Sequence, residues 1–336
     1  MPDGAALLAS APVPVSLQKI GSLSINRLLF RQRRAELLCS LQDGKLKIVI
    51  REPWKIRHIQ TANLVSEAIA VLGVTALPRF YINTDDSPYG QSHPITVFGN
   101  CSVNGHADCA APDFSFNGWP EARFADFDAK VRQIAAASEV AARDNRAFWA
   151  GVCNNSARST LVRISQRNLH AIEAVEVVPN HDLPENRCNL RFKPMEEQAA
   201  EYRYMVDVEG VGFSGRLKLL LHAARVVLVV DRPYREFFFN DMEPFRHYVP
   251  VARDSSDLVE RIDWLRSNPL REAEIVREAQ HFARTRLTRK AAIEKWAELL
   301  EEHRKAGGKL KSGVEHLPRA DRNFAAAPRE KERVGG

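Results

Sequence analysis

The sequence has no apolar run of the roughly 20 residues that a membrane-spanning helix needs. Cysteine is also scarce: there are five in 336 residues, and none forms a Cys-x-x-Cys pair. An odd cysteine count in a chain of this length argues against a disulfide framework. Residues 1–17 have no basic flank, and Pro12 and Pro14 interrupt their apolar part, so no signal peptide is predicted. We expect a cytoplasmic or peripheral membrane protein, or one of the secretory pathway if an upstream anchor is missing.

Excess positive charge is small outside the C-terminal tail. The net charge is +6, and residues 305–336 hold eight Lys/Arg against four Asp/Glu, which is +4 of that total. The remaining +2 is too little for the clustered basic surface that nucleic acid requires. We therefore expect no nucleic acid partner and a basic, disordered tail over 305–336. A peripheral membrane contact is the alternative role of the tail.

One loop holds Cys101 and Cys109, with His106 and Asp108 nearby. The spacing is not that of a known zinc finger, and no metal site is predicted. A zinc site and a Cys101–Cys109 disulfide stay open as alternatives to ordinary loop thiols.

Alternating strand and helix patterns predict an α/β fold with two domains. Short β-type runs at 46–51 and 79–82 flank a helical pattern at 59–72, and a second series begins with a strand at 148–152. The charged segment 143–146 is predicted to link the two series. Three amphipathic helices, starting near residues 257, 269 and 288, end the ordered chain. The prediction is an N-terminal Rossmann-like domain over 1–142 that faces a second Rossmann-like domain over 143–304 across a cleft.

A glycine turn follows a predicted strand at 204–208. Gly210-Val-Gly212-Phe-Ser-Gly215 matches G-x-G-x-x-G, the dinucleotide fingerprint. Asp231 and Glu236 lie roughly 20 residues further on, where a ribose-binding acid is expected. Taken alone, this pattern favours an NAD-dependent oxidoreductase.

Two cations follow this turn directly, Arg216 and Lys218. Cations at this place suit a diphosphate that is held and then released as a leaving group. The helix that carries them is predicted to be short, over 216–224, and the unit lies late in the chain. Both features weaken the interpretation as an NAD enzyme, and a tight turn with a solvated basic helix is the structural alternative.

The segment Asp85-Asp86-Ser-Pro88 follows the predicted strand at 79–82. A carboxylate here can take the proton of an acceptor hydroxyl. Paired acids can also hold a metal ion, and an Asx-Pro turn is a purely structural alternative. His247 is interpreted as a structural histidine near the cleft.

Across residues 201–300 the chain resembles glycosyltransferase family 90, which groups protein O-glucosyl- and O-xylosyltransferases with capsule-associated and lipopolysaccharide-modifying transferases. The matching residues, in order, are Tyr202-Arg-Tyr204, Gly210, Ser214, Arg216, Lys218, Glu236-Phe-Phe238, Pro244-Phe245, His247-Tyr-Val-Pro-Val251 and Asp257-Leu258. Upstream, Ile82-Asn-Thr-Asp-Asp86-Ser-Pro88 resembles the family's I-N-x-x-D-x-P segment. The segment around Phe148 to Gly151 departs from the pattern, because Ala150 stands where the family usually has Arg.

The resemblance implies a metal-independent, inverting transferase of GT-B type, with two facing Rossmann-like domains and a C-terminal helical segment. It implies Asp86 as the catalytic base and a UDP-sugar, glucose or xylose, as the donor substrate, with no cofactor. The donor-binding residues it implies, together with the glycine turn, are Arg158, Gly210, Gly212, Ser214, Arg216, Lys218, Glu236 and Phe237. Protein, lipopolysaccharide and other glycan acceptors are all compatible with it. An NAD-dependent oxidoreductase and a non-catalytic binding module remain the alternatives.

Overall fold

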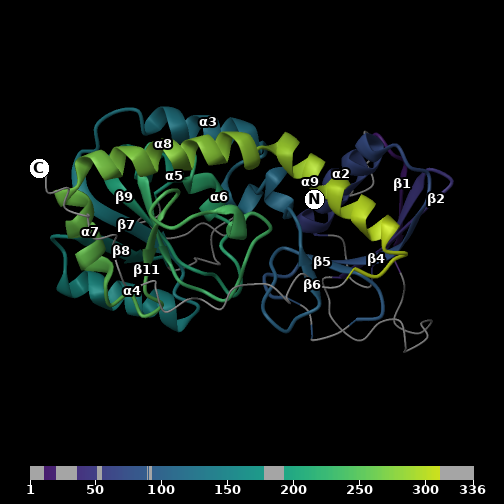
Figure 1. Cartoon of the computed structure of the whole chain (residues 1–336), viewed down its shortest axis with the longest axis horizontal. Helices are drawn as coiled ribbons and strands as arrows, with labels where there is room; N and C mark the ends of the chain where they lie inside the picture. The colour runs from purple at the N-terminus through teal and green to yellow at the C-terminus, as the bar shows by residue number, and fades with distance from the viewer. Residues whose placement is uncertain are drawn as a thin grey trace, which may run out of the picture.

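The computed structural model describes residues 11–19, 36–50, 55–88, 90, 93–177 and 193–310. Two α/β domains lie side by side along the long axis of the molecule (Figure 1). Each domain is built on one β-sheet with helices packed against it. The predicted α/β class, with two facing domains and a helical C-terminal segment, is confirmed.

The N-terminal sheet has six strands in the order β1-β3-β2-β4-β5-β6. Their bounds are β1 (Val15–Lys19), β2 (Glu36–Gln42), β3 (Lys45–Ile50), β4 (Leu77–Asn83), β5 (Val97–Gly99) and β6 (Asp108–Ala110). β2 runs antiparallel to both of its neighbours, whereas the remaining pairs are parallel. The sheet is therefore mixed rather than the all-parallel sheet of a regular Rossmann domain. Helix α2 (Ile56–Leu72) connects β3 to β4.

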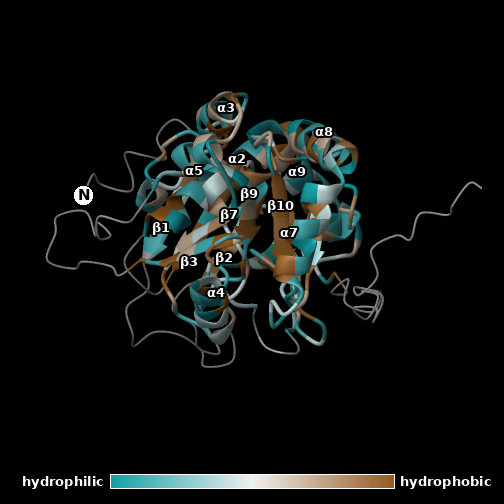
Figure 2. Ribbon diagram, turned by 90° about the vertical axis from the view of Figure 1, so that its left-hand side faces the viewer, coloured by the Kyte–Doolittle hydropathy of each residue, from teal (hydrophilic) through white to brown (hydrophobic). Residues whose placement is uncertain are grey.

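The second sheet has five strands, all parallel, in the order β11-β10-β9-β7-β8. Their bounds are β7 (Asp144–Gly151), β8 (Ile172–Glu176), β9 (Tyr202–Asp207), β10 (Val226–Val230) and β11 (Val249–Val251). Every residue of β10 is buried, as its unbroken Val/Leu run predicts for a strand covered on both faces. Figure 2 shows β9 and β10 as a hydrophobic band inside the ribbon.

Helices cover both faces of this sheet (Figure 1). Apolar residues of α4 (Ser156–Arg167) and α7 (Leu258–Ser267) pack with one face. The other face packs with α3 (Phe127–Ala137), α5 (Met195–Glu201), the short α6 (Leu217–Leu220) and α8 (Pro269–Arg286). The hydrophobic cluster on this second face continues into the N-terminal domain without a break. The two domains therefore share one core.

The last helix, α9 (Arg289–Lys305), returns to the N-terminal domain and packs against α2. Its Trp296 Nε1 donates to the Pro112 carbonyl at 2.9 Å, and the His303 ring lies within hydrogen-bond distance of Thr96 Oγ1, also 2.9 Å. The last helix therefore crosses back from the second domain onto the first. The contacts of this helix tie the two domains together.

The structure differs from the predicted link at 143–146 and from the predicted domain boundary at residue 142. Residues 143–146 were predicted as a link, but β7 begins at Asp144, where the Arg146 guanidinium pairs with Asp144 and Glu173. The charges of this segment are an ion-pair cluster at a strand start, so the prediction of a link was wrong. Helix α3 precedes the predicted boundary at residue 142, yet it packs with α5 and α6 of the second domain.

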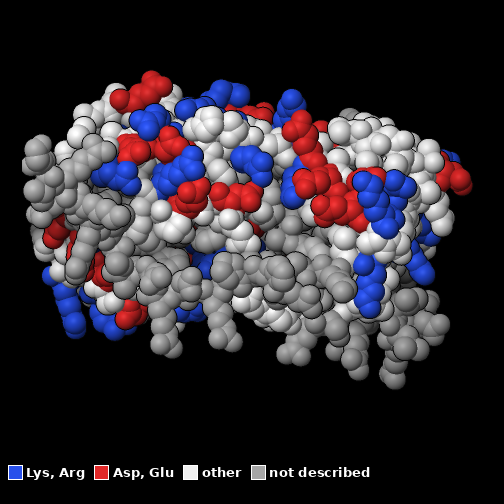
Figure 3. Space-filling view, viewed as in Figure 1, with Lys and Arg blue, Asp and Glu red and all other residues white. Residues whose placement is uncertain are grey.

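The predicted disordered tail lies largely outside the described residues. Its first residues are placed on the N-terminal domain: the Gly308 carbonyl accepts from the Thr96 amide at 3.3 Å, and the Leu310 amide donates to Thr96 Oγ1 at 2.9 Å. On the face shown in Figure 3, the described Lys/Arg and Asp/Glu side chains are intermixed.

Candidate active site

A cavity of about 380 Å³ lies between the two domains. On the second domain it lies beyond the carboxyl ends of β7 and β9, with Gly151 and Val152 from one strand end and Gly210 and Phe213 from the other. The chain leaves β7 toward β8 on one side and later returns to β9 on the other. This is the switch point of the sheet, where open α/β sheets bind their ligands.

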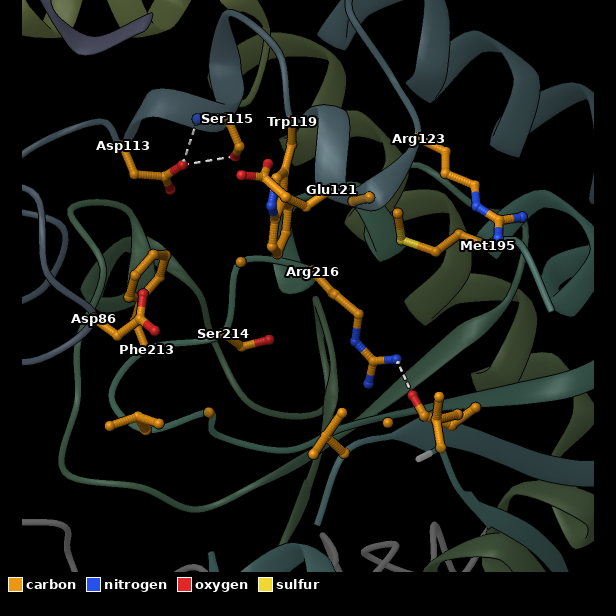
Figure 4. Close-up of a pocket in the computed structure, with 18 of the residues that line it drawn as sticks. Asp86, Asp113, Ser115, Trp119, Glu121, Arg123, Met195, Phe213, Ser214 and Arg216 are labelled. Atoms are coloured by element: carbon orange, nitrogen blue, oxygen red, sulfur yellow. Dashed lines mark hydrogen bonds between the residues drawn. The ribbon is translucent and has the colours of Figure 1, made fainter. Parts of the chain in front are cut away.

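Figure 4 shows the arrangement of polar side chains in this cavity. Asp86 lies at one end, Arg123 and Met195 lie at the other, and Ser214 and Arg216 lie between them. The first domain thus contributes a carboxylate, and the second contributes a cation. The volume is in the range of a small-molecule site.

Asp86 is held by its own loop after β4. The Asn83 side chain accepts from the Asp85 amide at 3.0 Å and donates to the Ser87 carbonyl at 2.8 Å, which closes a tight turn. The Asp86 carboxylate receives a hydrogen bond from Arg57 Nη1 at 2.8 Å, and 40% of its side chain is exposed. This partly open carboxylate faces the cavity.

Arg158 and Arg216 line the cavity from the second domain. Arg158 donates from Nε to the Glu209 carbonyl at 2.8 Å and from Nη1 to the Val152 carbonyl at 2.9 Å. Arg216 donates from Nη1 to the Ala150 carbonyl at 2.9 Å. Both guanidiniums therefore bind neutral carbonyl oxygens, and neither forms an ion pair with a carboxylate of the described residues.

Burial weakens the charged form of both arginines. Burial, and then the neighbouring charge of Arg216, lower the pKa of Arg158 to about 10. Burial also lowers the pKa of Arg216, whose Nη2 is buried without a hydrogen-bond partner among the described residues. Arginine side chains keep their proton in proteins, so a bound anion would supply the missing partner.

The glycines of the fingerprint meet the first domain. A Cβ built on Gly212 would lie 1.6 Å from the Asp86 carbonyl oxygen, and one on Gly215 would lie 2.7 Å from the Trp119 ring. A Cβ on Gly210 would lie 3.1 Å from the Phe213 carbonyl oxygen, which is a tight contact within the turn itself. Two of the three glycines are thus explained by close packing between the domains.

Ser214 lines the cavity, and its hydroxyl donates to Asp207 Oδ1 at 2.5 Å. Lys218 instead lies in the domain interface, where its ammonium pairs with Asp113 Oδ2 at 2.7 Å. These two side chains are 1% and 4% exposed, so the Lys218 charge is neutralised before any ligand binds. Of the two predicted cations after the turn, only Arg216 reaches the cavity wall.

Glu236 and Phe237 lie behind the cavity wall. Arg232 donates to Glu236 Oε1 at 3.2 Å and also to the buried Asp207. Burial raises the pKa of Glu236, against the opposing charge of Arg232. The Phe237 ring packs on Phe116, with 5.8 Å between centroids. Neither residue is part of the cavity lining, although Glu236 Oε2 is buried without a partner among the described residues.

Sequence reasoning missed several residues of the site. Arg57 sits on the first turn of α2, upstream of the predicted helical pattern, and nothing in its spacing marks it. Met195 and Glu196 begin α5 and line the far end of the cavity beside Lys130, which pairs with Glu196. Pro194 directly before them was the only local signal of a helix start.

Cys101 and Cys109 are both free thiols, and Cys101 Sγ contacts the Asp86 carbonyl at 3.8 Å. His247 Nδ1 accepts from the Glu243 amide at 2.9 Å, which agrees with a structural role. Within the described ranges, no group of three or more His, Cys, Asp and Glu side chains is placed to hold a metal ion. No helix of the described part of the chain is long and apolar enough to cross a membrane.

A cavity at the switch point of a parallel sheet, with a carboxylate facing two unpaired arginines, defines a candidate site for an anionic ligand. The profile of glycosyl transferase family 90 matches residues 72–316. The chain therefore belongs to this family, as its motifs around the glycine turn and Asp86 predicted.

Curated relatives are protein O-glucosyltransferase 2 of Danio rerio, 27% identical over 62% of this chain and 43% of the relative, and human protein O-glucosyltransferase 3, 26% identical over 74% and 51%. O-glucosyltransferase rumi of Drosophila pseudoobscura is 27% identical over 66% and 59%. The chain spans about half the length of the curated relatives it matches.

Among solved structures, the Anabaena protein HepE in complex with UDP and glucose matches with a TM-score of 0.36 and 13% identity, over 72% of this chain and 76% of that one. The C-terminal domain of a group 1 glycosyl transferase from Francisella tularensis matches with a TM-score of 0.34 and 9% identity, over 46% and 92%.

Proposed function

We propose that this protein transfers a sugar, glucose in the first instance, from a UDP-sugar to an acceptor hydroxyl with inversion at the anomeric carbon. One observation carries the proposal. The cavity places the Asp86 carboxylate of one domain opposite Arg158 and Arg216 of the other, and both arginines lack a carboxylate partner among the described residues. The proposed proton acceptor and the proposed anion site thus share one cavity.

Asp86 is proposed as the general base. An acceptor hydroxyl is a weak nucleophile at neutral pH, and a carboxylate within hydrogen-bond reach takes its proton while the new bond to the sugar forms. Because a single attack occurs on the face opposite the leaving group, one carboxylate suffices and the configuration inverts. Two carboxylates close together would instead serve a double displacement.

Arg158 and Arg216 are proposed to bind the diphosphate. Negative charge grows on this group as the bond to the sugar breaks, and cations fixed in a buried site stabilise it most effectively. Gly210 and Ser214 line the same stretch of the cavity and are kept as donor contacts. Gly212, Lys218, Glu236 and Phe237 would then support the site from behind.

The relatives are named as protein O-glucosyltransferases, which favours glucose as the transferred sugar and a hydroxyl as its acceptor. UDP-xylose is the second donor to test. Protein and glycan hydroxyls, including those of lipopolysaccharide, are the acceptor classes to screen. A cytoplasmic or peripheral location, against a secretory one, stays a prediction.

The test is the release of UDP from UDP-glucose and UDP-xylose, with EDTA present, by wild type and Asp86→Asn. Loss of the base is expected to lower turnover by roughly 10²- to 10⁴-fold. UDP affinity, measured by calorimetry, is expected to be unchanged. Proton NMR of the first-formed sugar is expected to show the β-anomer from the α-linked donor.

Retention of the α-anomer would overturn the inverting mechanism. Full turnover by Asp86→Asn would remove Asp86 as the base. Binding of UDP without turnover of either donor, over a panel of peptide and glycan acceptors, would favour the non-catalytic binding module.

A further inference from the structure

We infer that Arg57 is a positioning residue, which holds one oxygen of the Asp86 carboxylate so that the other faces the acceptor hydroxyl. The inference rests on the proposed role of Asp86 as the base. It assigns a function to a cavity residue that neither the motifs nor the family pattern singled out.

The first support is the contact itself. Arg57 Nη1 donates to Asp86 Oδ1 at 2.8 Å, and both side chains line the cavity. Oδ2 accepts no hydrogen bond from any described residue. A carboxylate with one oxygen fixed and the other open cannot rotate freely, so its open oxygen points in one direction.

The second support is the rigid mounting of Arg57. It lies in the first turn of α2, and α2 packs against both α9 and the 3₁₀ turn η1 (Phe114–Phe116). The guanidinium carbon lies 4.8 Å from the centroid of the Phe114 ring. A planar cation over an aromatic face is attracted to it, which fixes the plane of the guanidinium.

The third support is the way η1 is fixed to the second domain. Asp113 caps η1 by accepting from the Ser115 amide at 2.8 Å, and its other oxygen accepts from Lys218 at 2.7 Å. A buried ion pair from the donor side therefore holds the turn that carries Phe114. Contacts run without a break from Lys218 through η1 and Arg57 to the Asp86 carboxylate.

Arg57 differs in this respect from Arg158 and Arg216. Arg158 and Arg216 donate to backbone carbonyls, so their charge is available to a ligand. Arg57 instead donates to the carboxylate of the proposed base. The geometry thus points to an action through Asp86 rather than on the diphosphate.

The experiment measures UDP release from UDP-glucose with water as the acceptor, for wild type, Arg57→Met, Arg57→Lys, Asp86→Asn and the double variant of Arg57→Met with Asp86→Asn. A misdirected base is expected to lower the kcat of Arg57→Met by roughly 10- to 100-fold. KM for UDP-glucose and Kd for UDP are expected to stay near wild type. Arg57→Lys should restore part of kcat, because it returns the charge without the planar fork. Arg79→Met, an exposed arginine on β4, is the matched control.

The double variant decides between the two modes of action. If Arg57 acts through Asp86, the double variant loses no more activity than Asp86→Asn alone. A further loss in the double variant, a raised KM in Arg57→Met, or a wild-type kcat in that variant would overturn the inference. Full activity of Asp86→Asn would instead indicate that the proposed function of Asp86 itself is wrong.

Crystal structures of wild type and Arg57→Met with UDP give a readout that needs no turnover. The carboxylate of Asp86 is expected to change its orientation, or to occupy several, once Arg57 is gone. An unchanged carboxylate in the variant would overturn the inference even if water proved too poor an acceptor for the kinetic test.

Discussion

The backbone carbonyl of Asp86 lies directly against Gly212, so that a Cβ on the glycine would meet the carbonyl oxygen at 1.6 Å. The Phe213 amide, next in the chain, donates to the same oxygen at 3.4 Å. The glycine turn of the second domain therefore sets the position of the loop that carries the proposed base. Gly212 has no positive φ, so space rather than backbone conformation requires a glycine here.

Gly212→Ala is expected to push the Asp86 loop away from the turn. Overpacking of this kind costs about 1–3 kcal/mol of stability, and a base displaced by 1 Å can lose roughly 100-fold in rate. The measurements are the free energy of unfolding in urea and UDP release from UDP-glucose. Arg158 and Arg216 are not displaced by the change, so UDP affinity should fall much less than turnover.

Gly90→Ala is the matched control, since a Cβ at Gly90 meets no atom within 4 Å. Wild-type turnover by Gly212→Ala would show that the two domains separate at this contact without consequence. The coupling between the turn and the base would then be absent.

Arg158 and Arg216 should bind the phosphates of UDP rather than its uridine. Arg158→Ala and Arg216→Ala each remove a charged hydrogen-bond donor, which typically costs about 1.5–3 kcal/mol, or roughly 10- to 100-fold in Kd. Calorimetry with UDP is expected to show this loss, whereas binding of uridine, which has no phosphate, should change little. Arg163→Ala, an exposed arginine on the same helix as Arg158, is the control. An equal loss for uridine and UDP would mean that the variants deform the cavity instead.

Much of the fold could be predicted from the sequence, because hydrophobic periodicity reports burial directly. The strand at β10 and the helices α7 to α9 follow their apolar patterns closely. The three-residue strands β5 and β6 are too short to give a pattern. β2 was not predicted as a strand. Its antiparallel direction could not be predicted either, because strand direction depends on pairing partners and not on local composition.

The site was predicted only in part, because motif spacing is visible in the sequence but contacts with the other domain are not. Motif spacing identified Asp86 and Arg216, which line the cavity, but it also included Lys218, which pairs with Asp113 105 residues earlier in the chain. Spacing cannot show that a partner from the other domain already neutralises a charge. The same limit hid Arg57, whose role depends on a contact 29 residues away.

The buried pair of Lys218 and Asp113 allows a test of whether Lys218 has a structural role or binds the ligand. Lys218→Met leaves a buried carboxylate without its cation, which is expected to destabilise the fold by about 3–5 kcal/mol. The UDP affinity of the folded fraction should change by much less than that of Arg216→Ala. Thermal unfolding and calorimetry below the transition measure the two effects separately.

Lys290→Met serves as the comparison, because Lys290 is 84% exposed and pairs with Glu294 on the surface of α9. Such exposed pairs contribute about 0–1 kcal/mol. A Lys218→Met variant with the wild-type melting temperature and no UDP binding would reverse the assignment and make Lys218 a phosphate contact.

His222 should make stability depend on pH in mildly acidic solution. Burial lowers its pKa to about 4, and the ring lies 3.0 Å from the Leu287 carbonyl. In the unfolded chain this histidine has an ordinary pKa of about 6.5. Between pH 4 and pH 6.5 the unfolded chain therefore binds a proton at His222 that the folded protein does not bind. Stability from this group is therefore fully present above pH 6.5 and is lost as the pH falls toward 4, with a slope of up to about 1.4 kcal/mol per pH unit.

Urea unfolding at several pH values in this window measures the slope for wild type and His222→Gln. His222→Gln is expected to be less stable at pH 7, and its unfolding free energy should depend less steeply on pH, by the contribution of about one proton. An unchanged slope would mean that His222 is already accessible to protons in the folded protein.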